Sequence, residues 1–364
     1  MGTQPQNLPT GHATSTGSYR LQVSAVIDET HDARSLVLDV PPALRERFAY
    51  RPGQFLSFRV PCAGKLLTRC YSMASSPLCD AQPKVTIKRV DGGRVSNWMN
   101  QQVHVGDWLE VLPPAGHFCL PARPGTDDQR PLVLFGGGSG ITPVFSILKS
   151  ALHSGTRPIT LVYANRDEAS VIFKEELRAL SQAHPERLEV FHQLDSVQGF
   201  LSAARVRQLV RHRGDGEYFI CGPGPFMDTV EGALLALGEP REHIHVERFV
   251  SPPDPDQLET LELQARAAAS ESTCEALWVE LDGQQHEVPC QPGDTLLQSC
   301  KAAGLDVPSS CEEGFCGACM CQVTQGQTLL ARNDVLSERE LSEGWTLACQ
   351  SRPSGARVQV KFPD

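Results

Sequence analysis

The chain has 364 residues and a formal net charge of −10, with 40% hydrophobic and 21% charged residues. This length predicts two or three domains with sizeable cores, and the composition excludes a disordered or fibrous protein. There is no block of Lys and Arg, which argues against a nucleic-acid partner, and no apolar run long enough to predict a membrane span.

Thirteen cysteines are spread along the chain, an odd number that does not suggest a disulfide framework. Such frameworks are typical of short secreted chains, so reduced thiols in the cytoplasm are the better interpretation. Residues 1–17 are polar, have no apolar segment and no basic side chain, and are predicted to form a disordered tail rather than an export signal.

Residues 18–125 contain short alternating or β-branched runs, such as 21–26, 35–38, 54–58 and 84–88, separated by turn residues. Several short strands at this spacing predict an antiparallel barrel or sandwich. Residues 126–250 have a different pattern, in which short apolar runs alternate with helical stretches near 143–154, 170–183, 202–211 and 225–237. This alternation predicts an α/β domain with a parallel sheet and helices on both faces.

Residues 251–274 are rich in Pro, Ala and acidic side chains and have no clear apolar period, so they are predicted to be an interdomain linker. A third domain is predicted over residues 275–364, with strands near 277–281, 286–288 and 357–361 and a short helix near 294–303. Residues 276–364 carry six Lys or Arg against twelve Asp or Glu, so much of the negative charge belongs to this domain.

The strongest chemical signal is a set of four cysteines in this third domain. Cys311, Cys316 and Cys319 follow the spacing C-x4-C-x2-C, and Cys349 comes after 29 further residues. This is the plant-type ligand spacing for a [2Fe–2S] cluster, in which four thiolates converge on two irons. The alternatives are a zinc site, which favours paired C-x2-4-C knuckles, or buried free thiols, which need no such spacing.

Two glycine-rich segments in the α/β domain suggest a nucleotide site. Residues 136–143 read GGGSGITP and lie between the first predicted strand and helix, where small residues let a dinucleotide approach the backbone. Residues 221–227 read CGPGPFM and follow the fourth strand, which places them at the same carboxyl edge of a parallel sheet. Either segment alone is weak evidence, but together they favour a dinucleotide over a plain connection.

In the barrel, residues 69–72 read RCYS and place a guanidinium, an aromatic ring and a hydroxyl near a strand end. Arg suits a pyrophosphate and Tyr can stack on a flavin ring, although an amphipathic edge strand would explain the tetrapeptide equally well. Residues 93–97 open a predicted helix, whose free N–H groups would suit an anion.

The order of these motifs, with an E-x-F segment at Glu247–Phe249, resembles the ferredoxin–NADP reductase superfamily, in its oxygenase-reductase branch with a C-terminal plant-type ferredoxin domain. The resemblance covers about residues 19–364. Within the branch, the sequence is similar to the reductase components of 3-ketosteroid 9α-hydroxylases around residues 69–72, 163–167, 171–173, 221–227 and 347–353. Reductases of phenylacetyl-CoA epoxidases are similar in layout and are the alternative.

This resemblance implies a multidomain fold, with an antiparallel β-barrel flavin domain, an α/β parallel-sheet nucleotide domain and an α+β β-grasp ferredoxin domain. It also implies roles for residues near the flavin N5 and the nicotinamide, for residues that hold FAD or the coenzyme, and for four cluster ligands. The residues nearest the reaction would be Ser72, Cys221, Glu247 and Phe249. The cofactor-binding residues would be Arg69, Cys70, Tyr71, Ser72, Ile87, Lys88, Val90, Gly93, Arg94, Val95, Ser96, Asn97, Gly138, Gly140, Thr142, Arg166, Gly222, Pro223, Phe226 and Met227. The metal ligands would be Cys311, Cys316, Cys319 and Cys349.

The implied activity is that of a monomeric NAD(P)H-dependent oxidoreductase that passes electrons from NADH through FAD and the [2Fe–2S] cluster to a terminal oxygenase, of the Rieske type and acting in steroid degradation. A redox-sensing regulatory protein is a remote alternative, because no DNA-reading element appears in the sequence. The coenzyme is left open by the residues themselves, because Arg166 would suit the 2′-phosphate of NADPH and the adjacent Asp167 the ribose of NADH. The resemblance favours NADH, with NADPH possible.

Overall fold

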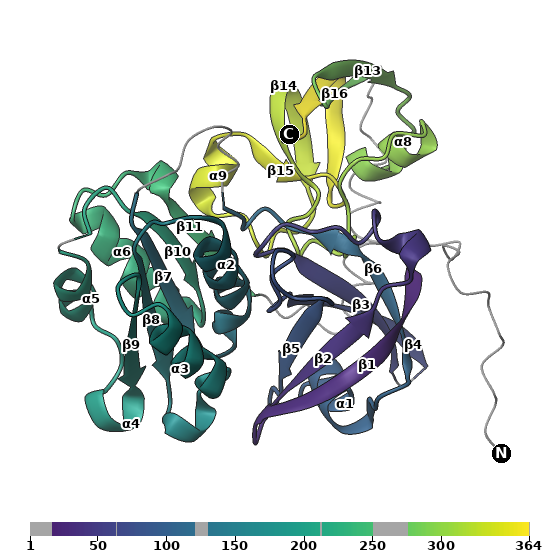
Figure 1. The fold of residues 1–364 in the computed structure, drawn as a ribbon. Coiled ribbons are helices and arrows are strands. Elements are labelled where there is room, and N and C mark those ends of the chain that lie inside the picture. Colours follow the sequence, from purple (N-terminus) through teal and green to yellow (C-terminus); the bar gives the residue numbers. More distant parts are fainter. Residues whose placement is uncertain (1–16, 63, 121–129, 212, 250–275, 364) are drawn as a thin grey trace. The chain divides into compact units, whose positions relative to one another are not determined.

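The computed structural model describes residues 17–62, 64–120, 130–211, 213–249 and 276–363 (Figure 1). The predicted linker over residues 251–274 and nearly all of the predicted tail over residues 1–17 therefore lie outside the described residues. The chain divides into two compact units, and the change from the first to the second follows Phe249, with Ala115–His117 belonging to the second.

The first half of the first unit is a six-stranded sheet whose neighbouring strands run in the order β4-β3-β6-β1-β2-β5. The strands are β1 (Tyr19–Thr30), β2 (Ala33–Asp39), β3 (Phe55–Cys62), β4 (Lys65–Ser72), β5 (Lys84–Lys88) and β6 (Trp108–Ala115). The registered pairs β1/β2, β1/β6, β2/β5 and β3/β4 are all antiparallel. The two edge strands meet at an antiparallel bridge between Met73 and Val85, which curls the sheet into the predicted barrel.

Helix α1 (Arg94–Gln102) packs against this barrel because Val95 and Met99, one turn apart, are both buried in its core. A short 3-10 helix, η1 (Pro42–Leu44), buries Leu44 in the same core.

The second half of the first unit is a five-stranded parallel sheet in the order β11-β10-β7-β8-β9. Its strands are β7 (Leu132–Gly137), β8 (Ile159–Asn165), β9 (Leu188–Leu194), β10 (Glu217–Cys221) and β11 (Ile244–Glu247). All seven residues of β8 are buried, as expected for a strand covered on both faces. The chain moves outward from β7 to β9 and then returns to the other side of β7, so the order of the strands reverses between β7 and β10.

Helices cover both faces of this sheet, as predicted (Figure 1). Side chains of α2 (Ile141–Ser154) and α3 (Lys174–Ala183) pack with Leu132 and Leu134. Side chains of α5 (Ala203–Val210) and α6 (Gly224–Ala236) pack with Val133 and Phe135, the alternate residues of the same strand. Shorter elements are η2 (Gly138–Gly140), η3 (Glu168–Ser170), α4 (Asp195–Gln198) and η4 (Arg241–His243).

One predicted helix begins later than expected. The sequence predicts a helix near 170–183, whereas α3 begins at Lys174. The carboxylate of Asp167 accepts hydrogen bonds from the N–H and hydroxyl of Ser170, which closes η3 as a separate turn. Phe173 then has a φ of 59°, a left-handed conformation that no helix can continue through.

The second unit is a mixed five-stranded sheet in the order β13-β12-β16-β14-β15. Its strands are β12 (Ala276–Leu281), β13 (Gln284–Val288), β14 (Met320–Leu330), β15 (Trp345–Leu347) and β16 (Ser351–Lys361). Strands β12 and β16 are parallel, and the other registered pairs are antiparallel. Helices α8 (Leu296–Ala302) and α9 (Glu338–Ser342) each begin with a capping box, which fixes their first residues.

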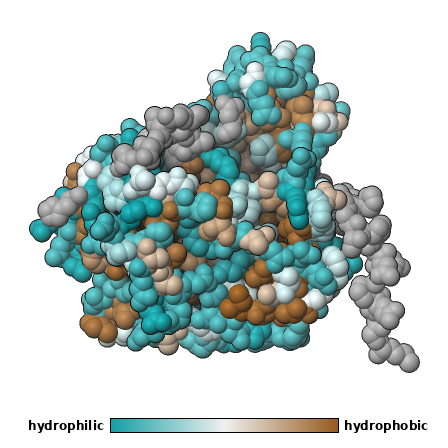
Figure 2. All heavy atoms as spheres, viewed as in Figure 1, coloured by the Kyte–Doolittle hydropathy of each residue, from teal (hydrophilic) through white to brown (hydrophobic). Residues whose placement is uncertain are grey.

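The face drawn in Figure 2 is largely hydrophilic, with apolar side chains gathered in small patches. Among the residues that the structure describes, no helix is both long enough and apolar enough to cross a membrane.

Candidate redox and coenzyme sites

The four cysteines of the predicted cluster lie together in the second unit. Cys311, Cys316 and Cys319 occupy the loop between α8 and β14, and Cys349 follows β15. The N–H of Cys311 donates to Sγ of Cys316 at 3.4 Å, and the N–H of Cys349 donates to Sγ of Cys319 at 3.5 Å. The thiols are thus arranged as two neighbouring pairs, 311 with 316 and 319 with 349.

The loop takes this shape because three of its residues adopt left-handed backbone. Gly314 and Gly317 have φ values of 83° and 71°, and Glu312 has a φ of 60°. A Cβ atom at Gly314 would lie 2.8 Å from Cγ of Gln350, closer than side chains approach one another. Glycine is therefore required at position 314 for steric as well as conformational reasons.

Several N–H groups point at the sulfurs. The N–H of Glu313 donates to Sγ of Cys311 at 3.4 Å. The side-chain amide of Gln350 donates to Sγ of Cys349 at 3.8 Å and to the carbonyl oxygen of Glu312 at 3.1 Å. Such donors stabilise negative charge on thiolates and on the sulfur of a cluster.

These residues fit a [2Fe–2S] cluster better than a zinc ion. Burial raises the pKa of the Cys311 thiol, and the neighbouring Cys319 together with burial raises the pKa of Cys349, so in the absence of metal both hold protons that iron displaces. Within the described ranges, no group of three or more His, Cys, Asp or Glu side chains converges as the ligands of a single metal ion. Two thiol pairs suit two irons, and their soft donors suit iron–sulfur chemistry. Cys321 is packed in the core of this unit.

In the first unit, the two glycine-rich segments meet at the point where the strand order of the parallel sheet reverses. A Cβ atom at Gly140 would overlap the carbonyl oxygen of Cys221, and one at Gly222 would lie 3.0 Å from Cα of Gly137. The backbones therefore touch in a way that only glycine permits. A crevice at the carboxyl edge of such a sheet is where dinucleotides bind in α/β domains.

The first of these turns is held by two side chains. The hydroxyl of Tyr163 on β8 donates to the carbonyl oxygen of Gly138 at 3.1 Å and accepts from the N–H of Ile172 at 3.2 Å. The hydroxyl of Thr142 donates to the carbonyl oxygen of Ser139 at 3.1 Å. Thr142 thus lies at the turn, and its role toward a coenzyme stays a prediction. The contribution of Tyr163 could not be predicted from the sequence, because it depends on which strand lies beside β7.

Cys221 and Glu247 end neighbouring strands and lie opposite each other in the register of β10 and β11. Burial raises the pKa of Glu247 to about 8, and Oε2 of this carboxyl is buried without a hydrogen-bond partner. Burial and the nearby Glu247 together raise the pKa of the Cys221 thiol. A buried carboxyl that holds a proton near neutral pH is the kind of group found at functional sites.

Residues 69–72, which are predicted to lie near a flavin, form the end of β4. Ser72 is buried, and its hydroxyl has no hydrogen-bond partner. Burial raises the pKa of the Tyr71 hydroxyl, and its ring packs beside Phe58 at a centroid distance of 5.9 Å. Arg69 donates to the carbonyl oxygen of Thr68, and Cys70 lies 3.0 Å from the hydroxyl of Ser57. The buried, unsatisfied hydroxyl of Ser72 fits a position that a polar ring atom of a flavin would satisfy.

Two side chains at the start of α1 make hydrogen bonds with the backbone of the turn that precedes the helix. Ser96 accepts from the N–H of Val90, and the amide of Asn97 donates to the carbonyl oxygens of Val90 and Gly93. Gly93 is the residue that precedes the helix, and Arg94 is its first residue. Ile87 and Val95 are buried in the barrel core, so only their backbone is available to a flavin, whereas Val90 is exposed.

The predicted residues around the second glycine-rich turn are divided between core and surface. Pro223 precedes α6, and a Cβ atom at Gly137 would lie 2.9 Å from its ring and 3.1 Å from the ring of Phe226. Met227 is buried in the core of the sheet. Phe249 is 47% exposed and follows the end of β11 by two residues.

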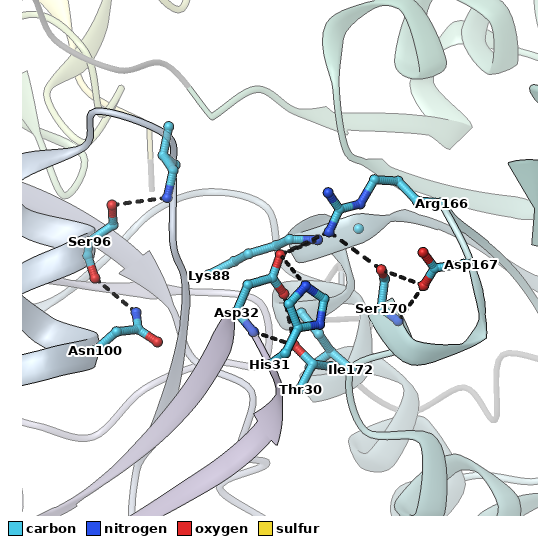
Figure 3. Close-up of polar contacts among 12 residues, drawn as sticks. Thr30, His31, Asp32, Lys88, Ser96, Asn100, Arg166, Asp167, Ser170 and Ile172 are labelled. Atoms are coloured by element: carbon cyan, nitrogen blue, oxygen red, sulfur yellow. Dashed lines mark hydrogen bonds and ion pairs between the residues drawn. The ribbon is translucent and has the colours of Figure 1, made fainter. Parts of the chain in front are cut away.

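Asp32 brings Lys88 and Arg166 together, and it is not among the predicted site residues. Arg166 donates to Oδ2 of Asp32 at 3.0 Å, and Nζ of Lys88 lies 3.7 Å from the same oxygen (Figure 3). Nζ of Lys88 also lies 4.0 Å from the position of a Cβ atom at Gly138, so this ammonium is at the coenzyme turn as well as at the end of a barrel strand. No sequence pattern marks Asp32, because its partners are 56 and 134 residues away.

Three family models match successive parts of the chain. They are the oxidoreductase FAD-binding domain over residues 20–119, the oxidoreductase NAD-binding domain over residues 134–232 and the 2Fe-2S iron-sulfur cluster binding domain over residues 279–354. The chain is therefore an oxidoreductase with domains for FAD, NAD and a [2Fe–2S] cluster, in the order that the motifs predict.

The chain is similar over nearly its whole length to named oxygenase components. It is 48% identical to the 3-ketosteroid-9-alpha-monooxygenase ferredoxin reductase component of Rhodococcus rhodochrous, over 95% of this chain and 97% of that protein. It is 33% identical to a component of the 1,2-phenylacetyl-CoA epoxidase of Escherichia coli, over 95% of this chain and 98% of that protein.

Among solved structures, phthalate dioxygenase reductase has the same fold, with a TM-score of 0.58, 24% identity and coverage of 95% of this chain and 98% of that one. The identity to the ferredoxin reductase components is high enough, over enough of both proteins, to assign the family. The chain therefore belongs to the family of ferredoxin reductase components of 3-ketosteroid 9α-monooxygenases.

Proposed function

We propose that this protein takes electrons from NADH and delivers them, through FAD and the [2Fe–2S] cluster, to a Rieske-type terminal oxygenase that hydroxylates a 3-ketosteroid at C9. The names of relatives at 43–48% identity support the steroid and the oxygenase. Bound FAD would accept a hydride from NADH and release the two electrons one at a time to the cluster.

The observation that carries this proposal is the contact between the barrel and the coenzyme turn. Nζ of Lys88, at the end of β5, lies beside Gly138. Strand β5 begins where its edge meets β4, next to Ser72 and Tyr71. The five-residue strand β5 thus reaches the coenzyme turn at one end and lies next to the residues proposed for flavin at the other, which supports hydride transfer between two bound rings.

The residues of this chain have distinct roles in the proposal. Ser72, whose buried hydroxyl has no partner, would donate to the flavin near N5, and Tyr71 at the end of the same strand would pack against the flavin ring. Arg69, with the backbone of residues 93–97, holds the pyrophosphate of FAD. The turns at residues 136–140 and 221–224 hold the coenzyme, and Cys221 with Glu247 borders its nicotinamide. Phe249, which is exposed, would cover the flavin.

In the second unit, we propose that Cys311 and Cys316 bind one iron, and Cys319 and Cys349 the other, because these are the pairs in contact. The acidic charge of residues 276–364 suits a docking surface of positive charge on the oxygenase. We further propose that the protein works as a monomer in the cytoplasm, where a reducing environment keeps its free cysteines intact.

Arg166, which would suit a 2′-phosphate, is engaged by Asp32, and Asp167, which would suit a free ribose, is engaged by Ser170. These contacts hold both side chains equally and do not choose between the two coenzymes. The match to the oxidoreductase NAD-binding domain supports NADH as the preferred coenzyme.

An anaerobic visible spectrum tests the electron route. The purified protein is recorded before and after stoichiometric NADH, and then NADPH, with addition of a Rieske oxygenase component and a 3-ketosteroid as the last step. We expect flavin and iron–sulfur bands that NADH bleaches, and reoxidation by the oxygenase with the steroid hydroxylated. A spectrum with flavin alone, or bands untouched by both coenzymes, would refute the proposal, and reoxidation by an epoxidase component alone would favour the epoxidase reductases instead.

A further inference from the structure

Asp32 lies at the turn between β1 and β2 and is held there by the barrel. Its Oδ1 accepts a hydrogen bond from the hydroxyl of Thr30 at 2.9 Å, and its carbonyl oxygen accepts from the N–H of Arg89 at 2.7 Å. The second bond ties the turn to the end of β5, next to Lys88. Contacts within the barrel are therefore enough to hold this carboxylate in place, without any group from the α/β domain.

The other carboxylate oxygen of Asp32 faces basic side chains from both halves of the first unit. Arg166, which follows β8, donates to Oδ2 at 3.0 Å, and Lys88 of β5 and His31 of the same turn each lie 3.7 Å from it (Figure 3). The side chain of Asp32 is 13% exposed, so solvent screens these attractions less than it does at a surface pair.

The charges around Asp32 keep it ionised. Burial opposes its ionisation, but the hydroxyl of Thr30 and the charges of Lys88, His31 and Arg166 outweigh burial and lower its pKa. Burial lowers the pKa of Lys88, and the charge of Asp32 opposes that shift. Asp167, the remaining acidic group here, is bound to Ser170.

This contact differs from the other contacts between the barrel and the α/β domain. Lys84 with Glu176 at 2.8 Å, Asp80 with Lys149 at 2.6 Å, and Ser76 with Ser150 at 2.7 Å involve helices α2 and α3. The contact of Asp32 involves the ends of strands, and its Lys88 lies beside Gly138 of the coenzyme turn. Of these four contacts, the one at Asp32 lies beside the coenzyme turn, where it can set how the two ring-binding regions face each other.

We propose that Asp32 is a positioning residue for hydride transfer, because it joins Arg166 of the α/β domain to Lys88 of the barrel at the coenzyme edge. The inference rests on the proposed function, since it concerns the geometry between flavin and nicotinamide. Without this ion pair, the two domains keep their contacts through helices α2 and α3 but lose the contact beside the proposed flavin and nicotinamide sites. Misplacement of about 1 Å between reacting groups is enough to slow a reaction up to about a hundredfold.

The test compares Asp32→Asn with two matched variants in the purified, FAD-loaded protein. Asp28→Asn removes a carboxylate that pairs with Arg34 within the same hairpin, and Glu176→Gln removes a pair between the domains on the helix side. Stopped-flow flavin reduction at saturating NADH measures the limiting rate, and its dependence on NADH concentration measures affinity. We expect Asp32→Asn to lower the limiting rate about tenfold with little change in FAD content, and both controls to remain within about twofold of the native protein.

Arg166→Gln supplies a second variant, because Arg166 is 60% exposed and its loss leaves no buried charge unpaired on its own domain. We expect the same loss of limiting rate, no further loss in the double variant, and partial recovery with Asp32→Glu. High salt should slow the native protein more than either variant, because only the native protein has the Asp32–Arg166 pair for salt to screen.

A native limiting rate in Asp32→Asn would overturn the inference, and so would a loss confined to FAD content or to Glu176→Gln. A slowed rate in Asp32→Asn with unslowed Arg166→Gln would also overturn it, because the tie between the domains would then be irrelevant. If NADH fails to reduce the flavin of the native protein, the proposed function itself fails, which distinguishes the two outcomes.

Discussion

The cluster loop and the coenzyme edge are built in different ways. Cys311, Cys316 and Cys319 lie within nine residues of one another, and the loop that carries them needs only two glycines and one long-range partner, Cys349. The coenzyme edge is assembled from the ends of four parallel strands and from a turn of the barrel. The chemistry of a local site can be predicted from the spacing of its residues. The chemistry of an assembled site depends on which strands are neighbours in the sheet.

The largest effect is expected at the cluster loop. Cys319→Ser replaces a soft thiolate with a hard hydroxyl, so we expect loss of the iron–sulfur absorption and of electron delivery to any one-electron acceptor. Flavin reduction by NADH should continue, because its residues lie in the other unit. Iron content and flavin bleaching are measured on the same sample, and Cys321→Ser is the control. Retained iron in Cys319→Ser would contradict the ligand assignment.

Gly140→Ala tests whether the coenzyme edge, like the cluster loop, requires glycine at a position of close backbone contact. The added methyl would overlap the carbonyl oxygen of Cys221, although the φ of Gly140 is ordinary for any residue. We expect a loss of about 1–3 kcal/mol in unfolding free energy and weaker NADH binding, measured by denaturant unfolding and by titration. Gly232→Ala, inside α6 where nothing lies within 4 Å, is the control. Equal behaviour of the two variants would show that the turns need not touch.

Glu247 gives the coenzyme edge a dependence on pH that the cluster loop should lack. Burial raises its pKa to about 8 from 4.5, so the folded protein holds a proton that the unfolded chain has lost. The stabilisation is therefore fullest below the unfolded pKa and is lost as pH rises toward 8. Glu247→Gln should flatten the decline of unfolding free energy between pH 5 and about 8, while the exposed Glu189→Gln should not. An unchanged slope would mean that Glu247 is ionised in the folded state.

The smallest effect concerns the hydrogen bond to the cluster ligand. Gln350→Leu removes the amide that donates to Sγ of Cys349, and reduction of the cluster adds negative charge that this donor stabilises. At about 0.5–1.5 kcal/mol for one hydrogen bond, the midpoint potential should fall by roughly 20–60 mV. An EPR-monitored redox titration measures it. Gln322→Leu, which removes an amide bonded to the carbonyl oxygen of Glu343 in the same unit, should leave the potential unchanged.

The fold was largely predictable because its periodicities are local. Strands alternating with helices over residues 126–250 predict a parallel sheet, and the structure confirms it, since a strand buried on both faces needs a continuous apolar run such as β8. The start of α3 was predicted wrongly, because the bond between Asp167 and Ser170 and the left-handed Phe173 leave no trace in hydrophobic periodicity. The boundaries of the domains remain predictions, as do the roles of the site residues.

The sequence by itself determined the chemistry of this protein. Four soft thiols at one spacing suit only a few metal centres, and glycines beside strand ends suit a backbone that must approach another group, so residue type and order were enough. Only the tertiary structure decided which side chains are free to act. Arg166 and Asp167 are adjacent in the chain and equally suited to a coenzyme, but one is engaged by Asp32 of the barrel and the other by Ser170. Electrostatic partners that are 134 residues apart are chosen by how the barrel and the α/β domain pack, which no local pattern encodes.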